Sequence, residues 1–385
     1  MAKRPIILSI AGLGIGALLL FIGSRMQPPR AVGAHRNVPP SATQQPLTVE
    51  YRPDSSLLKR SPVTSTSEWI DDIAHQLTAA NDPQTSRRLL ADLRAFLDGL
   101  PREAASRDVQ SYLRSKNDAV TTLDLTVGPA GLLGDASSLR IFLLDYLGQI
   151  DKPAAGTVAA EILSHYTTPD EWAVSLRNYA WANPGADGKE FLQARAQELL
   201  SNPEWIKNPT AGFLQAFDSI VYANAAFLTP QLTAFIRDTS NRAVGHAAYL
   251  TLDRLVITEP ASVLKFLAAE PQFLETREQT RANLFARADI RDTAQRALLE
   301  QYLLDPRRSN EELQTFSAIY PNANFMISYN LLTTAATPTR DELVTHDSSA
   351  LDAVNEWLRD PHFQRLKPQL EVIRSRLEGF VRQGN

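Results

Sequence analysis

The chain contains many residues that can act as acids, bases or nucleophiles, but they do not form a recognised catalytic pattern. It has no cysteine, which excludes thiolate metal sites and a cysteine nucleophile. Two Ser-x-x-Lys pairs, Ser56 with Lys59 and Ser262 with Lys265, lack the further motifs that a serine acyl-enzyme needs. The histidines are scattered, at His35, His75, His165, His246, His346 and His362. Since none has the spacing of a zinc-binding helix, we predict no catalytic residue, no metal site and no cofactor.

A glycine-containing stretch, "LDLTVGPAGLLGDASSLR" at residues 123–140, raises the question of phosphate binding. Gly128, Gly131 and Gly134 precede a predicted helix, and free N–H groups at the start of a helix attract anions. The stretch has neither the lysine of a phosphate-binding loop nor the spacing of a dinucleotide-binding turn. We therefore interpret it as a plain loop.

An aromatic cluster with basic residues is the strongest candidate for a binding site. It consists of Trp172, Arg177, Tyr179, Trp181, Trp205 and Lys207. Trp172 and Tyr179 follow helical spacing and are expected in the core, whereas Trp181 and Trp205 lie beside Asn-Pro turns and are expected to be partly exposed. The candidate partner-binding residues are therefore Arg177, Trp181, Trp205 and Lys207. Packing within the protein is the alternative interpretation, and contact with a protein or a glycan is the functional one.

The apolar pattern that must position these residues is helical almost throughout the chain after residue 66. In "SLRIFLLDYLGQI" the large apolar residues recur at intervals of three and four, the spacing of one helix face. Capping residues followed by proline, such as Thr168-Pro169 and Asp305-Pro306, mark helix starts. Helix pairs are predicted to begin near Ser137, Pro169, Pro209, Ser240, Thr276 and Ser309. The intervals, 32, 40, 31, 36 and 33 residues, predict an all-α fold of helical hairpins stacked as an α-solenoid.

One of these units, "SNRAVGHAAYLTLDRLVITEPASVLKFLAAEP" at residues 240–271, resembles a HEAT repeat. Small alanines and Val244 lie in its first helix, Asp253-Arg254 lie near the end of that helix, and Pro260 opens the second. The resemblance implies a curved scaffold that binds other macromolecules along one face. The tetratricopeptide pattern fits less well, because its Trp, Gly and Tyr spacing is missing.

The N-terminal residues predict a membrane segment. Residues 5–23 are uncharged and apolar, and about 20 residues are needed for a helix to cross a bilayer. We interpret residues 1–25 as an uncleaved anchor in the inner membrane of a bacterium, with Gly12 and Gly16 as a pair through which two such helices could dimerise. A signal peptide cut near Ala34 is the alternative, although its cleavage site would lie far beyond the apolar run.

Residues 26–66 contain seven prolines and few large apolar side chains, which predicts a flexible tether. Residues 1–60 hold eight Lys or Arg against two acidic residues, a net charge of +6. The total is −4, so the remainder carries −10 and is a poor partner for nucleic acid. Residues 67–136 then form a preliminary helical segment and residues 137–385 the repeat domain.

These features together predict a single-pass inner-membrane protein whose domain lies in the periplasm. The repeat domain is expected to act as a binding scaffold for a protein partner in the cell envelope. Two alternatives remain open from the residues. One is an enzyme of unrecognised type, which would need an enclosed pocket, and the other is a secreted helical protein whose apolar segment has been removed.

Overall fold

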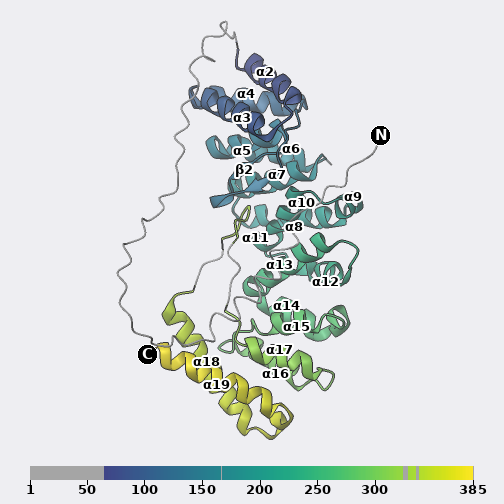
Figure 1. Ribbon diagram of the computed structural model, residues 1–385, viewed down its shortest axis with the longest axis vertical. Helices are drawn as coiled ribbons and strands as arrows, with labels where there is room; N and C mark the ends of the chain where they lie inside the picture. The colour runs from purple at the N-terminus through teal and green to yellow at the C-terminus, as the bar shows by residue number, and fades with distance from the viewer. Residues whose placement is uncertain (1–64, 166, 324–327, 335–337, 385) are drawn as a thin grey trace, which may run out of the picture. The chain divides into compact units, whose positions relative to one another are not determined.

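The computed structural model describes residues 65–165, 167–323, 328–334 and 338–384, which are almost wholly helical (Figure 1). The first helices are α2 (Thr66–Ala79), α3 (Pro83–Asp98), α4 (Arg102–Ser115), α5 (Leu139–Ile150), α6 (Lys152–Leu163), α7 (Pro169–Ala182), α8 (Ala186–Ser201) and α9 (Pro203–Lys207). They are followed by α10 (Ala211–Ala216), α11 (Asp218–Tyr222), α12 (Thr229–Arg237), α13 (Arg242–Thr258), α14 (Pro260–Ala269) and α15 (Glu278–Phe285). The last are α16 (Thr293–Leu304), α17 (Asn310–Ile319), α18 (Arg340–Arg359) and α19 (Lys367–Gly384). The all-α fold class is confirmed for these residues.

The remaining regular elements are short. The 3₁₀ helices are η2 (Pro129–Gly131), η3 (Ala226–Leu228), η4 (Pro271–Leu274) and η5 (Pro361–Leu366). The strands β1 (Thr126–Val127) and β2 (Leu133–Asp135) pair antiparallel, with a bulge beside Val127. The loop predicted around Gly128 and Gly131 is thus the tip of a small β-hairpin, which the sequence pattern missed because its strands are too short to alternate.

The caps explain where the predicted helix starts were right and where they were wrong. Thr168 caps α7 and Asn202 caps α9, each with proline next to it. Asp305-Pro306 instead lies in a turn, and α17 begins only after Ser309, whose hydroxyl accepts the Glu312 N–H. A hydroxyl a few residues downstream offers the same cap, so a capping residue before proline does not by itself fix the start.

Helices that are close in the chain are also close in space. Within pairs, α5 packs on α6, α13 on α14 and α18 on α19. Between pairs, α5 packs on α7, α11 on α13, α13 on α15 and α15 on α17. The apolar core extends through the described residues from Ile70 to Leu377. Helices that follow one another in the chain lie beside one another in Figure 1, and the apolar side chains between them are buried.

A series of charge pairs accompanies this packing. The pairs are Arg140 with Glu171, Asp145 with Arg177, Asp218 with Arg254, Asp253 with Arg287, and Arg281 with Glu312. The partners of each pair are 31 to 36 residues apart, which is close to the spacing of the predicted helix pairs. Each pair joins one helix pair to the next.

The predicted membrane anchor and tether lie outside the described residues. Across the helices of residues 65–384 that the structure describes, none is long and apolar enough to span a bilayer.

Candidate functional site

The structure brings two of the four predicted site residues together. The Arg177 guanidinium carbon lies 4.4 Å from the centroid of the Trp181 ring, within the range of a cation–π contact. The Lys152 ammonium lies 5.6 Å from the same ring. Trp181 is half-buried between these cations. Lys207 is exposed at the end of α9.

Trp205 belongs to a different aromatic group, and the prediction that it is partly exposed is wrong. Its side chain is 8% exposed. The ring lies edge-on to Trp172, with centroids 5.2 Å apart, and also contacts Phe213. The short helix α9 places this ring against α7, so the two turns flanking it do not leave it in solvent. Trp205 therefore packs in the core.

Arg177 is a structural crosslink with no exposed surface. Its side chain is 0% exposed and donates from Nη1 to Asp145 Oδ1 and to the Gly131 carbonyl, each at 2.6 Å. Nη2 donates to Asn178 Oδ1 at 2.9 Å. Burial lowers the pKa of the Arg177 guanidinium, and the facing Asp145 carboxylate opposes that shift. Arg177 thus ties α7 to α5 and to the β-hairpin, and only its π contact with Trp181 reaches a partly exposed residue.

The hairpin tip uses its polar groups internally. Gly131 has φ 75°, a left-handed conformation that favours glycine, and its carbonyl faces Arg177. The Gly128 N–H donates to the Leu132 carbonyl at 2.7 Å. These contacts support the interpretation of the stretch as a loop rather than a phosphate cradle.

A second site, which the sequence analysis missed, lies where residues 328–334 meet α11. We call residues 328–334 the return segment, because this yellow-green part of the chain follows α17 in the sequence but lies beside α11 and the hairpin (Figure 1). The Asp218 carboxylate, which is 2% exposed, accepts the backbone N–H groups of Leu332 at 2.6 Å and Thr333 at 2.9 Å. It also accepts the Thr333 hydroxyl.

Arg254 completes this site from α13. Its Nη1 donates to Asp218 Oδ1 at 2.6 Å and to Thr333 Oγ1 at 2.9 Å. The Arg254 side chain is 23% exposed, so the pair is reachable from solvent on one side. We call Asp218 and Arg254 the Asp218 site. Its one sequence signal was Arg254, in the Asp-Arg pair of the HEAT-like unit.

The apolar side chain of Leu331 also anchors the return segment, and the chain upstream of the segment is held separately. Leu331 is 2% exposed, and its carbonyl lies so close to Gly131 that a Cβ there would clash. Upstream of the segment, the Asn322 N–H donates to the Ala286 carbonyl at 2.8 Å, and Arg287 Nη1 donates to the Asn322 carbonyl at 3.1 Å. Asn322 is thus held at the end of α15, while Leu332 and Thr333 are held at α11 and α13.

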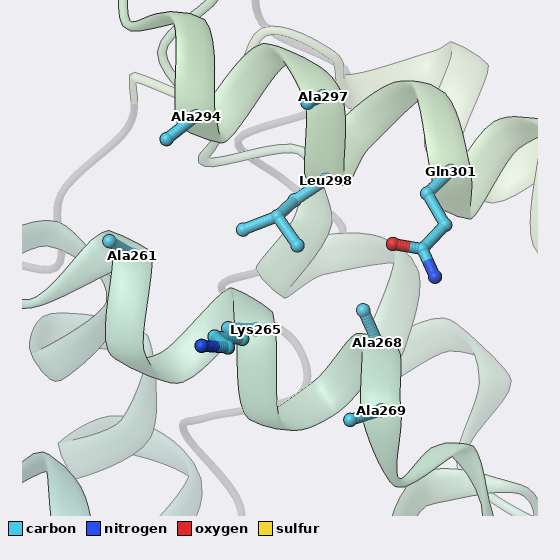
Figure 2. A pocket seen from close by; sticks show the side chains of 8 residues that line it. All are labelled: Ala261, Lys265, Ala268, Ala269, Ala294, Ala297, Leu298 and Gln301. Atoms are coloured by element: carbon cyan, nitrogen blue, oxygen red, sulfur yellow. The ribbon is translucent and has the colours of Figure 1, made fainter.

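A shallow groove between α14 and α16 is the third candidate, with a volume of about 430 Å³. It is lined by Ala261, Lys265, Ala268, Ala269, Ala294, Ala297, Leu298 and Gln301. Figure 2 shows Leu298 between the two helices and Gln301 extending toward Ala268. Lys265 of the Ser262-Lys265 pair lies here, and it is the one charged side chain among the lining residues. The groove thus offers apolar contact and little acid–base chemistry.

Among the residues that the structure describes, no group of three or more His, Cys, Asp or Glu side chains is placed to bind a metal ion. Comparison with known proteins gives no family: no family model, no curated protein and no solved structure matches the chain. At the Asp218 site the chain binds its own return segment, through two main-chain N–H groups and one hydroxyl of that segment.

Proposed function

We propose that the protein is a membrane-anchored helical-repeat scaffold that binds an irregular segment of a protein partner in the bacterial envelope. The observation that carries this proposal is the Asp218 carboxylate, which accepts two successive backbone N–H groups of an irregular segment. Leu331 and Leu332 form a bend, which lets two successive N–H groups reach one carboxylate. Main-chain hydrogen bonds of this kind give affinity for a peptide, and neighbouring side chains give selectivity. The return segment is thus an internal example of the ligand.

The charge pairs between helix pairs support the repeat architecture. In an α-solenoid each repeat contacts its neighbours, so the same contact recurs once per repeat. The charge pairs recur at a spacing of 31 to 36 residues, two of them between α5 and α7 and the others between α11 and α13, between α13 and the end of α15, and between α15 and α17. Asp253 and Arg254 of the HEAT-like unit point to opposite neighbours, Asp253 to Arg287 and Arg254 to Asp218.

In this proposal residues 1–25 anchor the chain in the inner membrane, residues 26–66 are the tether, and the helical domain lies in the periplasm. The apolar run of residues 5–23 supports the anchor. Trp181, partly exposed beside Lys152, and the exposed Lys207 are secondary contacts for the partner. Tryptophan gives a large contact area with a polar end, which suits binding surfaces.

A photo-crosslinking experiment in the bacterial envelope tests the proposal. The crosslinking amino acid p-benzoylphenylalanine replaces Tyr222, which lies one helical turn after Asp218 on α11. We expect one discrete adduct with another envelope protein, weakened by D218N and by an excess of synthetic peptide Ser-Tyr-Asn-Leu-Leu-Thr-Thr. The control replaces Val372, which is 54% exposed on α19.

The dependence on Asp218 is the decisive result of this experiment. An adduct of equal yield from the Tyr222 and Val372 positions, or one that D218N leaves unchanged, contradicts binding at the Asp218 site. The absence of any adduct from the Tyr222 position contradicts it as well.

A further inference from the structure

The return segment breaks the contact pattern of the rest of the described chain. Its bonds to Asp218 join residues 114 and 115 positions apart, whereas the ion pairs between different helices of the described residues join residues 31 to 60 positions apart. A helix pair needs its neighbours to bury its apolar face, but the return segment forms no helix or strand. The return segment therefore packs on the helices as a separate peptide ligand would.

The attachment of the return segment is compact. One apolar side chain, Leu331, is buried, and one carboxylate, Asp218, binds the two N–H groups that follow it. Within the segment, Tyr329 is 60% exposed. The Asn330 side-chain amide donates to the Thr333 carbonyl at 3.2 Å, which shapes the segment itself and does not attach it to the array. Its hold on the array thus depends on Leu331 and on the contacts of Leu332 and Thr333.

We propose that the return segment is an internal competitor that occupies the Asp218 site until a partner's segment of the same bent shape replaces it. This inference rests on the proposed scaffold function. The partner segment that fits carries a leucine-like residue, one variable residue and then a threonine or serine, as Leu331, Leu332 and Thr333 do here. The apolar residue fills the Leu331 position, and the hydroxyl meets Asp218 and Arg254 as Thr333 does.

The buried charge of Asp218 favours direct replacement of the return segment by a partner segment over an empty site. Asp218 is 2% exposed, and a buried carboxylate that loses its donors is destabilised. Arg254 remains as one donor when the return segment leaves, but the two N–H groups and the hydroxyl are lost. A partner that supplies the same three donors restores them. The site therefore discriminates against segments with proline at either N–H position, because proline has no N–H to donate.

Peptide binding to the full-length chain tests the inference. The probe is a fluorescein-labelled synthetic peptide with the sequence of residues 328–334, and the protein is kept in mild detergent. Occupancy of the site by its own segment lowers the apparent affinity by the fraction of open molecules. We expect weak binding to the wild type and at least about tenfold tighter binding to Leu331→Asp, whose return segment loses its buried anchor.

Matched variants separate release of the segment from damage to the fold. Tyr329→Asp adds the same charge to an exposed position two residues away and is expected to bind the peptide like the wild type. Adding D218N to Leu331→Asp is expected to abolish the gain. Circular dichroism establishes which variants are folded, and Leu331→Ala, a smaller change, serves if Leu331→Asp is not.

The outcomes distinguish this inference from the scaffold function itself. If a folded Leu331→Asp or Leu331→Ala variant binds the peptide no tighter than the wild type, the internal competitor is overturned. The scaffold function survives that result if the crosslinked adduct at Tyr222 still depends on Asp218. If peptide and adduct both fail in every variant, both proposals are overturned.

Discussion

Arg177 shows how one side chain can look like a binding residue in the sequence and act as a crosslink in the fold. A cation beside Trp181 suggests a partner site, yet the guanidinium is fully buried against Asp145 and the Gly131 carbonyl. Burying an ion pair costs desolvation that its attraction roughly offsets. Removal of one member leaves the other charge buried without its partner.

We therefore expect Arg177→Met to destabilise the protein strongly. Asp145 is 2% exposed and would lose its closest cationic partner, keeping only the longer contact with Arg94 at 3.7 Å among its ion pairs, so the free energy of unfolding should fall by about 3–5 kcal/mol. The matched control is Arg87→Ala, because Arg87 pairs with Asp135 but is 58% exposed, and ion pairs in solvent contribute little to stability. Urea unfolding followed by circular dichroism measures both. Equal losses in the two variants would contradict the buried role of Arg177.

A second residue-scale prediction concerns acid. Burial lowers the pKa of His346, Asp289 opposes this shift, and the buried Nδ1 has no hydrogen-bond partner within the described residues. As the pH falls, His346 is protonated in the unfolded chain before it is protonated in the folded one. The contribution of neutral His346 to stability is therefore complete above the unfolded pKa of about 6.5 and is lost as the pH falls below that value. Arg291 adds to the lowering and Asp347 opposes it.

We accordingly expect the unfolding temperature of the wild type to fall between about pH 7.5 and pH 5.5, and His346→Gln to lose less over that interval. His75→Gln, at an exposed position of α2, is the control and should follow the wild type. A His346→Gln profile that is superimposable on the wild type would show that His346 does not contribute to the acid sensitivity.

At the scale of elements, replacing glycine by alanine should change the free energy of unfolding in opposite directions at two positions. Gly156 of α6 faces Ala182 at the end of α7 so closely that an added Cβ would collide with it, whereas Gly379 of α19 has open space around it. Gly156→Ala should therefore lower the free energy of unfolding by about 1–3 kcal/mol through overpacking. Gly379→Ala should raise it by about 0.5–1 kcal/mol, since alanine favours a helix interior. Urea midpoints that move in the same direction would contradict the close approach of α6 to α7 at Gly156.

The helices were predictable because the chain carries their period. Leu139, Leu143 and Tyr146 repeat at helical spacing, and all three are buried in α5. The burial of Trp205 was not predictable from the turns beside it, because it depends on where α9 lies against α7. The short hairpin, β1 with β2, likewise has too few residues for a strand pattern to show.

The candidate site was harder to predict than the helices. The Asp218 site joins α11 to residues that follow more than a hundred positions later, with no local signal at Leu332 or Thr333. Periodicity reports on neighbours along the chain, so it cannot show a contact of this kind. The sequence analysis noted Asp253 and Arg254 as a pair near the end of one helix but not their partners, which are Arg287 and Asp218.

For the whole molecule, location is the prediction to test. If residues 1–25 anchor the chain, the full-length protein expressed in a bacterium should have its complete mass and sediment with membranes. Protease added to intact spheroplasts should digest the domain, and deletion of residues 1–25 should move the chain to the soluble fraction. A soluble chain that begins near His35 would instead indicate signal cleavage.

The long reach between Asp218 and Leu332 also has a consequence in time. The two residues are 114 positions apart, so Leu332 follows Asp218 by about 6–23 s at synthesis rates of about 5–20 residues per second. The helices around Asp218 contact close neighbours and can pack early, because short loops close at low entropic cost. If the return segment competes as proposed, a nascent chain presents an open Asp218 for seconds, and a partner present during synthesis would meet no competitor in that interval.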